Sequence, residues 1–390
     1  MNVLMYTHAF APSTGGVETY MMLLAEGLSK MSEGDGGPIH VTVATPTPAG
    51  GMDDARMPYR IVRRPNQMQL AKLIRAADIV HAAGPAFPPL VIAWLFRKPI
   101  VVEHSGYQSI CPNGMLLYGR DRVLCPGHFM ARRYRECLRC NQKDWGWLRS
   151  LRQLLLTFPR RWLCRRVASN VGPSRHIARR IALPKTEVIF HGVPPTPDNS
   201  SAQVTNRNGQ PVCFAYVGRL VIEKGVAVLL RAAAQLVRSG VDFRVRILGD
   251  GPERQSLEEL VRQFGLADRI EFVGAVPAER VTEALGWADA VVMPSVWEDV
   301  APLVAIEQMM KGKLVIASDI GGLGEEIGDT GLTFPPGDAA ALAGCMQRVL
   351  DSPELPKMIG SAARIRAVKL FTGDRMVQDH LAVYRRAMQC

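Results

Sequence analysis

The chain has 390 residues, of which 47% are hydrophobic and 21% are charged, and its formal net charge is +11. This length suffices for two domains with separate cores, and the composition excludes disordered and fibrous classes. The longest apolar runs, such as residues 87–96, are too short to cross a bilayer. Residues 1–6 read directly as a strand, without a basic leader or cleavage site, so we expect a cytoplasmic protein, at most peripheral at the inner face of the membrane.

Strand and helix patterns alternate along the first half of the chain. We predict strands over residues 2–6, 39–45, 78–81 and 100–104, and helices over residues 17–31, 67–76 and 87–96. Such alternation predicts a parallel sheet covered by helices.

Gly15 and Gly16 lie between the first strand and the first helix, where paired glycines let a phosphate approach backbone amides. His104 ends the last of these strands.

Residues 105–148 form a cysteine-rich insertion that we predict to lack regular structure. It contains Cys111, Cys125, Cys137 and Cys140, and the last two form a Cys-x2-Cys pair. Four thiols in such a segment of a cytoplasmic protein favour a structural zinc site over disulfides, with His128 as an alternative ligand. Free thiols are the plain alternative, and an iron–sulfur cluster is less favoured.

Positive charge is concentrated in residues 120–180, which hold fifteen Arg and one Lys against three acidic residues, a local net charge of +13. Within residues 148–181, Arg alternates with Leu, Phe and Trp. One interpretation is a basic amphipathic helix on an anionic membrane surface. The other is a helix that packs into its own domain with a solvated Arg face. No recognition motif supports nucleic acid as a partner.

The second half repeats the alternation after a segment rich in Pro, Asn and Ser. This composition predicts that residues 194–211 form a linker. Beyond it we expect strands over residues 212–217, 243–248, 270–273, 290–293 and 314–317, with helices between them, so this half predicts a second doubly wound sheet.

Two cations and two carboxylates follow strands of this second half. Arg219 and Lys224 come after the strand 212–217, where open α/β sheets bind their ligands. Arg and Lys both suit phosphate oxygens. Asp299 follows the strand 290–293, and Glu307 lies in a helix expected to start near residue 301 with Pro302 in its first turn. A carboxylate in so apolar a helix needs a partner, for which a pair of ribose hydroxyls or a buried backbone group would serve.

With these motifs, the chain resembles the retaining glycosyltransferases of family 4 over nearly its whole length. The resemblance implies a GT-B fold, an α/β architecture of two Rossmann-like doubly wound domains facing across a cleft. The domains would be residues 1–193 for the acceptor and 212–371 for the nucleotide sugar, with a last helix, 372–390, crossing back to the first domain.

The resemblance also implies roles for individual residues. Arg219 and Lys224 bind the donor diphosphate, Glu307 binds the ribose, and His104 orients the donor sugar. Asp299 occupies the first acidic position, where the family has Glu, and the adjacent Glu298 is the alternative. The remaining donor-binding residues are Gly15, Gly16, Val273, Gly274 and Leu303.

The implied activity is transfer of a sugar, with retention, from a UDP or GDP sugar to an acceptor hydroxyl. The acceptor would be a glycan or a lipid-linked molecule in cell-surface polysaccharide or glycolipid synthesis. No metal or cofactor is required for catalysis in this class, so zinc at the cysteines would be structural. Two alternatives stay open: a nucleotide-sugar epimerase on the same fold, and a degenerate nucleotide-sugar binding protein, which the Asp at position 299 favours.

Overall fold

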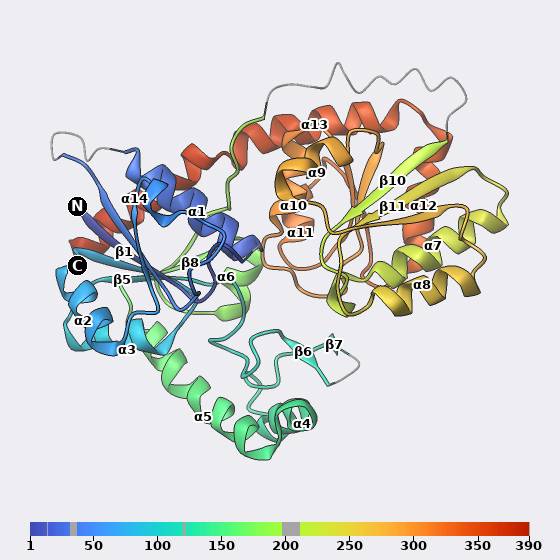
Figure 1. Ribbon diagram of the computed structural model, residues 1–390. Coiled ribbons are helices and arrows are strands. Elements are labelled where there is room, and N and C mark those ends of the chain that lie inside the picture. Colours follow the sequence, from blue (N-terminus) through green and yellow to red (C-terminus); the bar gives the residue numbers. More distant parts are fainter. Residues whose placement is uncertain (14, 32–36, 120–121, 197–210, 390) are drawn as a thin grey trace. The chain divides into compact units, whose positions relative to one another are not determined.

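The computed structural model describes residues 1–13, 15–31, 37–119, 122–196 and 211–389. The chain divides into two compact units, Met1–Pro194 with Phe371–Cys390 (unit 1) and Pro195–Leu370 (unit 2). Most of the predicted linker, residues 197–210, lies outside the described residues. Each unit is a Rossmann-like parallel sheet flanked by helices, so the predicted α/β fold class is confirmed (Figure 1).

Unit 1 contains a seven-stranded parallel sheet with the strand order β3-β2-β1-β4-β5-β8-β9. The order reverses between β1 and β4, as in doubly wound folds. Its strands are β1 (Asn2–Thr7), β2 (His40–Thr45), β3 (Arg60–Arg63), β4 (Ile79–Ala83), β5 (Ile100–Glu103), β8 (Ser169–Gly172) and β9 (Thr186–Val188).

Side-chain caps mark the starts of three helices of unit 1, namely α2, α6 and α14. Asn66 and Gln69 form a reciprocal capping box at the start of α2, and Ser174 caps α6. Helices α1 and α14 pack against each other, as do α2 and α3 (Figure 1). The helices are α1 (Gly16–Ser29), α2 (Gln67–Ala76), α3 (Phe87–Leu95), α4 (Tyr134–Trp145), α5 (Trp147–Cys164), α6 (Arg175–Ile181) and α14 (Gly373–Met388).

The C-terminal helix α14 belongs to unit 1 because the chain crosses back at residue 371. Val193 and Thr372 form a parallel bridge, and the amide of Val193 donates to the carbonyl of Phe371 at 2.9 Å. Gly27 on α1 lets α14 approach closely, since a β-carbon there would lie 2.4 Å from Val377. The sheet of unit 1 is therefore covered partly by the last residues of the chain.

Unit 2 contains a six-stranded parallel sheet in the order β12-β11-β10-β13-β14-β15. Its strands are β10 (Val212–Val217), β11 (Phe243–Leu248), β12 (Ile270–Gly274), β13 (Ala290–Met293), β14 (Leu314–Ser318) and β15 (Leu332–Phe334). Its helices are α7 (Val226–Arg238), α8 (Arg254–Gln263), α9 (Ala278–Ala284), α10 (Leu303–Met310), α11 (Leu323–Ile327), α12 (Ala339–Asp351) and α13 (Leu355–Leu370).

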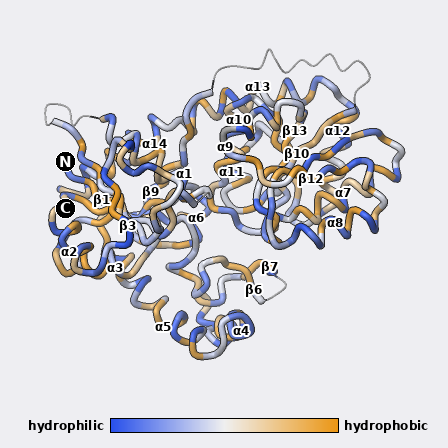
Figure 2. The backbone as a smooth tube through the Cα atoms, in the orientation of Figure 1, coloured by the Kyte–Doolittle hydropathy of each residue, from blue (hydrophilic) through white to orange (hydrophobic). Residues whose placement is uncertain are grey.

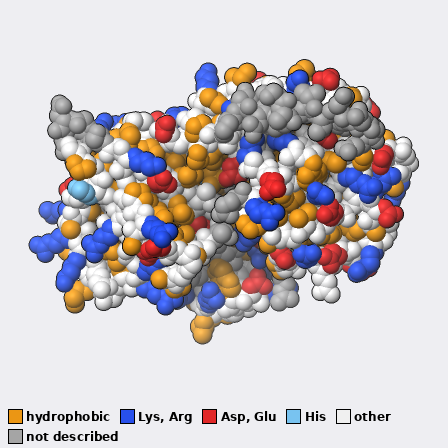
Figure 3. Space-filling view, turned by 45° about the horizontal axis from the view of Figure 1, so that its top comes forward, with side chains coloured by type: hydrophobic (Ala, Val, Ile, Leu, Met, Phe, Trp, Pro, Cys, Tyr) orange, Lys and Arg blue, Asp and Glu red, His pale blue; other side chains and the backbone are white. Residues whose placement is uncertain are grey.

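Apolar strands form the core of each unit. In unit 2, buried side chains of β10, β11, β13 and β14 pack against apolar faces of α7 and α12. Figure 2 shows hydrophobic stretches along the strands and mixed hydropathy along the surrounding helices. On the face that Figure 3 shows, Lys and Arg side chains are interspersed with acidic and hydrophobic ones.

Three local predictions were wrong. Residues 148–181 are not one helix, because α5 ends at Cys164 and the buried strand β8 separates it from α6. The cysteine-rich insertion has regular structure, namely the hairpin of β6 (Leu117–Tyr118) and β7 (Val123–Leu124) and the helix α4. Helix α10 begins at Leu303, and Pro302 is its N-cap.

Within the described ranges, no helix has the length and apolar content to span a bilayer.

Candidate active site

The predicted cations and carboxylates of unit 2 lie where its strand order reverses. Strands β10 and β13 are neighbours at this point. Arg219 follows the end of β10, and Glu298 and Asp299 follow the end of β13. Adjacent parallel strands whose connections run to opposite sides leave a crevice at their carboxyl ends, which is the usual ligand site of such sheets.

Lys224 and Asp299 are in direct contact across this crevice. Lys224, at the end of the short 3₁₀ helix Ile222–Lys224, places its Nζ 2.6 Å from Asp299 Oδ2. The Ser295 hydroxyl donates to the same oxygen at 3.0 Å. The Asp299 side chain is 7% exposed and that of Lys224 is 23% exposed, so the carboxylate is held inside while the ammonium reaches solvent. The ammonium and the hydroxyl supply this buried carboxylate with two hydrogen-bond donors, which offset the cost of its burial.

Two glycines allow the loops around this pair to approach each other. Gly225 has φ 67°, and a β-carbon there would lie 1.9 Å from the carbonyl oxygen of Pro294. Gly321 has φ 64°, and its β-carbon would lie 2.3 Å from the carbonyl oxygen of Asp299. Left-handed backbone and this lack of space both require glycine. The Lys224 loop is thereby packed against the loop that carries Asp299.

The other predicted donor residues of unit 2 differ in burial. Arg219 is exposed, and its carbonyl accepts from the Tyr216 hydroxyl at 2.8 Å. Glu307 on α10 is partly buried, which raises its pKa, although nearby Lys311 opposes that shift. Leu303 is buried at the start of α10, so only its backbone amide is suited to an anion.

Val273 and Gly274 end β12, two strands away from β10. Val273 is 41% exposed, and Gly274 accepts from the amide of Gly249 at 2.7 Å. Among the hydrogen bonds of the described residues, none joins Val273 or Gly274 to the Lys224–Asp299 pair.

Glu326 is a residue of this site that sequence reasoning missed. It lies on α11, is fully buried, and neither carboxylate oxygen has a hydrogen-bond partner among the described residues. Burial, reinforced by the charges of Asp299 and Glu325, raises its pKa well above the ordinary value, while Lys224 acts in the other direction. The available signal was the pair of adjacent carboxylates, Glu325 and Glu326, in a short helix that follows two glycines.

In unit 1, the predicted glycines and His104 also lie at carboxyl ends of strands. Gly15 is the N-cap of α1 and Gly16 its first residue, in the connection that follows β1. His104 follows β5 and is completely buried. Its Nε2 lies 2.9 Å from the side-chain oxygen of Asn170 on β8.

The contacts of Asn170 determine the tautomer of His104. The Asn170 amide nitrogen donates to the carbonyls of Cys164 at 3.0 Å and Pro184 at 2.9 Å, so the Asn170 oxygen faces His104. His104 Nε2 must therefore carry the proton, and Nδ1 presents a lone pair, which has no partner among the described residues. Burial lowers the pKa of His104 to about 4, so the ring is neutral at physiological pH. Asn170 was not predicted, because a buried Asn in a strand gives no motif.

The four cysteines of the insertion come from separate segments. Cys111 and Cys125 lie on either side of the β6–β7 hairpin, while Cys137 and Cys140 lie on α4. Burial, with smaller contributions from the neighbouring thiols, raises the pKa of Cys137 to about 12. Among the described residues, His81, Glu103 and His380 in unit 1 place three possible ligand atoms within 4.8 Å of one another. The four cysteines do not form such a group. His128 stacks edge-on against Tyr118, with ring centroids 5.1 Å apart.

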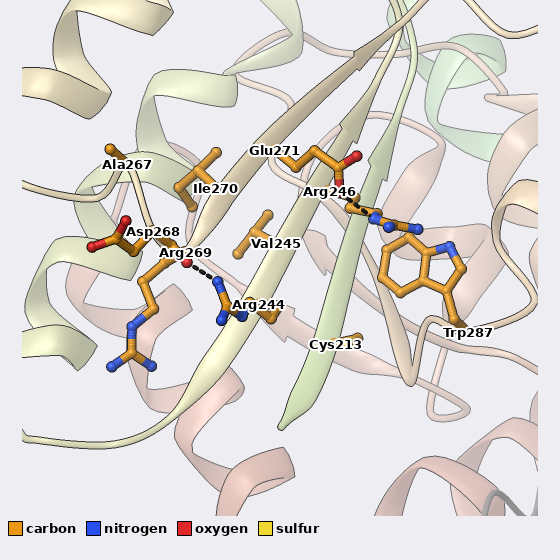
Figure 4. Close-up of a pocket in the computed structure, with 10 residues that line it drawn as sticks. All are labelled: Cys213, Arg244, Val245, Arg246, Ala267, Asp268, Arg269, Ile270, Glu271 and Trp287. Carbon is orange, nitrogen blue, oxygen red and sulfur yellow. Dashed lines mark hydrogen bonds and ion pairs between the residues drawn. The ribbon is translucent and has the colours of Figure 1, made fainter. Parts of the chain in front are cut away.

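A hollow of about 490 Å³ lies elsewhere on unit 2 (Figure 4). Its lining comes from the amino-terminal halves of β10, β11 and β12 and from Trp287, and it shares no residue with the predicted donor site. Arg246 pairs there with Glu271 and lies over the Trp287 ring at 4.6 Å. Because this is the opposite end of the sheet from Lys224 and Asp299, we do not assign the donor to it.

Family models match both halves of the chain. The model described as Glycosyltransferase Family 4 matches residues 14–196, and the model described as Glycosyl transferases group 1 matches residues 198–366. Among curated relatives, alpha-D-kanosaminyltransferase of Streptomyces kanamyceticus is 38% identical over 157 residues, covering 40% of each chain. The 2-deoxystreptamine glucosyltransferase of the same organism is 31% identical over 58% of this chain. The match spans 62% of that relative's length, less than two thirds.

Solved structures share the whole architecture at low identity. Sucrose-phosphate synthase from Thermosynechococcus elongatus aligns over 100% of this chain and 99% of its own, with a TM-score of 0.72 and 22% identity. Anabaena HepE in complex with UDP aligns over 98% of this chain and 99% of its own, with a TM-score of 0.70 and 19% identity. These likenesses concern the fold.

Proposed function

Because this chain belongs to the glycosyl transferases of group 1 and family 4, we propose that it transfers a sugar from a nucleoside diphosphate sugar to an acceptor hydroxyl. We propose a donor of the UDP or GDP type, retention of configuration, and an acceptor from polysaccharide or glycolipid synthesis. The solved structure of HepE with UDP supports the UDP choice.

The observation that carries this proposal is the Lys224–Asp299 pair at the switch point of the unit 2 sheet. Lys224 reaches solvent and Arg219 is exposed, so both can bind diphosphate oxygens. Asp299, rather than Glu298, contacts the cation, which supports Asp299 in the first acidic position. Glu307, in a setting that raises its pKa, would accept hydrogen bonds from a ribose.

His104 would act on the donor sugar as a neutral hydrogen-bond acceptor. Its Nδ1 lone pair suits a sugar hydroxyl, and its Nε2 proton is held by Asn170. A ring whose pKa is lowered to about 4 is not a cation at neutral pH, so it would position the sugar. The departing diphosphate, held by Arg219 and Lys224, would accept the acceptor's proton on the same face.

Calorimetric titration with UDP, GDP and their sugar conjugates tests the donor assignment. We expect one nucleotide to bind selectively and the Arg219→Ala, Lys224→Ala double variant to lose that binding. An Arg231→Ala, Lys357→Ala variant is the matched control, since both changes lie on other helices of unit 2. Unchanged binding in the first variant would refute the site. Turnover of the donor without an acceptor would instead favour an epimerase.

The first acidic position has its own test. We expect Asp299→Asn to lower turnover more than Glu298→Gln does, because Asp299 is the residue that contacts Lys224. The reverse order would place Glu298 in that role. Activity that appears only in Asp299→Glu would favour a degenerate binding protein.

An exposed apolar surface on α3 and α5 supports a membrane-associated acceptor. Trp94 and Trp162 meet edge-on at 5.8 Å, and the guanidinium of Arg166 lies 3.7 Å from the Trp162 ring centroid. Leu148 is 77% exposed and Leu155 is 58% exposed. Arg and aromatic side chains together favour anionic lipid headgroups and their boundary with the acyl chains. We propose that this surface binds an anionic membrane.

Liposome flotation tests this surface. We expect the protein to float with anionic vesicles at low salt and the Leu148→Glu, Leu155→Glu variant to remain soluble. Met358→Glu, Ile365→Glu is the control, because these side chains are 65% and 73% exposed on α13 of unit 2. Equal flotation of both variants would refute the assignment.

We also propose that Cys111, Cys125, Cys137 and Cys140 bind a structural zinc ion. Three of them are buried, and the amide of Gly119 donates to the Cys140 sulfur at 3.4 Å. Burial raises the pKa of Cys140, so zinc would have to displace the thiol proton. The Cys137→Ser, Cys140→Ser variant should lose one zinc per chain by mass spectrometry, whereas Cys345→Ser should not. Equal zinc in all three proteins would contradict the proposal.

A further inference from the structure

Four polar side chains converge in the closed interior of unit 1. Tyr20 comes from α1, His81 from β4, Glu103 from β5 and His380 from α14. All four are at most 1% exposed. We propose that these residues bind a zinc ion that joins the C-terminal helix to the sheet.

Most of the distances between the four ligand atoms are near those of a tetrahedral site. Glu103 Oε2 lies 3.1 Å from His380 Nε2 and 3.6 Å from His81 Nε2. The Tyr20 oxygen lies 3.3 Å from His380 Nε2 and 3.4 Å from His81 Nε2. Zinc bonds of about 2.0–2.1 Å to nitrogen and oxygen give a tetrahedron with edges of about 3.3–3.4 Å. The Tyr20 hydroxyl donates directly to Glu103 Oε2, closer than such an edge, so zinc binding would require this hydroxyl to lose its proton and move away from the carboxylate.

The outer contacts of the ligands match those of metal-binding side chains. His380 Nδ1 lies 2.8 Å from the carbonyl of Met376, so Nδ1 carries the proton and Nε2 of the neutral ring turns its lone pair inward. His81 Nδ1 lies 2.9 Å from the Tyr384 hydroxyl. The second oxygen of Glu103 lies 2.9 Å from His191 Nε2. Each of these three ligands is thus held by a polar contact on the side away from the proposed ion.

The charge of the cluster also favours a cation, beyond the Tyr20 hydroxyl that donates to Glu103 Oε2 and the His191 ring that contacts the other oxygen. A fully buried carboxylate is costly unless positive charge is nearby. With the proton of His380 directed at Met376, the inward face of a neutral His380 offers the carboxylate no donor. A zinc ion supplies the charge and binds both imidazoles and the carboxylate at once. A second proton on His380 is the competing explanation, which gives an imidazolium–carboxylate pair without metal.

The site would be structural, because its four ligands fill a tetrahedral shell and exclude substrate. It would fasten α14, which carries His380, to three elements from the first part of unit 1. The inference does not depend on glycosyl transfer, so activity assays and metal assays can fail independently.

Metal content of the purified full chain tests the proposal. The wild-type chain is loaded with zinc, freed of excess metal by gel filtration, and measured by mass spectrometry together with Glu103→Gln and His380→Gln. We expect both variants to lose about one zinc ion per chain. His40→Gln, an exposed histidine on β2, is the matched control and should retain it. Equal zinc in all four folded proteins would overturn the proposal in favour of the imidazolium–carboxylate pair.

X-ray absorption at the zinc edge of the wild type covers the case in which the variants do not fold. We expect scattering from imidazole nitrogen and carboxylate oxygen, in addition to sulfur if the cysteines also bind zinc. Cobalt substitution should give tetrahedral d–d bands that persist in Cys137→Ser, Cys140→Ser, where thiolate charge transfer is reduced. A zinc shell of sulfur alone, or no zinc, would refute the site.

Discussion

The two units have the same strand order around their reversal points but place their ionisable groups differently. In unit 2, Lys224 and Arg219 reach solvent from loops at the carboxyl ends of strands. In unit 1, Glu103, His81 and His380 are sealed between the sheet and α14. Burial alone would raise the pKa of Glu103, but its contacts with His191 and His380 outweigh that effect and lower the pKa. Unit 2 therefore presents charge to solvent at the site proposed for the donor, whereas unit 1 encloses charge between its own elements.

The largest expected effect tests the solvent-reaching cation of unit 2. Lys224→Ala should lower kcat/KM by about 10³, because it removes a charged contact to the diphosphate and leaves the buried Asp299 unpaired. Lys357→Ala, on α13, should leave kcat/KM unchanged. Steady-state kinetics with the preferred donor measures both. A loss below about tenfold would mean that Lys224 pairs with Asp299 for structure alone.

The next effect concerns the buried amide of unit 1. Asn170→Leu should lower kcat about 10²-fold, because His104 Nε2–H loses its acceptor and the ring orientation changes. Donor binding by calorimetry should change less than kcat. If Asn170 serves the fold alone, kcat measured on the folded fraction will match that of the wild type.

A backbone change should separate loop geometry from charge. Gly225→Ala should destabilise the protein by about 2 kcal/mol, because its β-carbon would collide with the Pro294 carbonyl in a left-handed conformation. Gly344→Ala is the control, since Gly344 lies exposed within α12 with free space around it, and alanine there should stabilise by about 0.5–1 kcal/mol. Chemical denaturation measures both. Equal stabilities would show that the two loops need no close approach.

The smallest effect is a pH dependence from Glu326. Burial raises its pKa above the value in the unfolded chain, so the folded state holds this proton more tightly. The stability from this group is present below the unfolded pKa and is lost as pH rises through the folded pKa. The melting temperature of the wild type should therefore fall toward alkaline pH, and in Glu326→Gln this fall should be smaller by a few degrees. Parallel pH profiles would show that another group causes the fall.

The sequence predicted those residues of the candidate site that belong to local sequence patterns. Strands β10, β11 and β13 and helix α2 have the predicted bounds, because the apolar runs of the strands and the capping box of the helix are local signals. Arg219, Lys224 and Asp299 follow strands, and the switch point of the sheet brings their loops together.

The residues that were missed owe their roles to contacts across the chain. Asn170 meets His104 from a neighbouring strand, and His380 meets Glu103 from a helix 277 residues away in sequence. The short strands β3, β8 and β9 were missed because they hold few apolar residues in a row. The break of the basic segment by β8 was missed for the same reason, since its four residues, Ser169–Gly172, include Ser, Asn and Gly.

The crossing of the chain at residue 371 sets the order in which the protein can be completed during synthesis. Unit 2 is one continuous stretch, Pro195–Leu370, and all its strands leave the ribosome before α14 does. The strands of unit 1 are made before unit 2, yet His380 and Tyr384, which close the interior of unit 1, are made after it. Unit 1 can therefore be completed only after unit 2 has been synthesised, and a stop codon or a protease cut just after residue 370 would leave Glu103 and His81 facing water instead of α14.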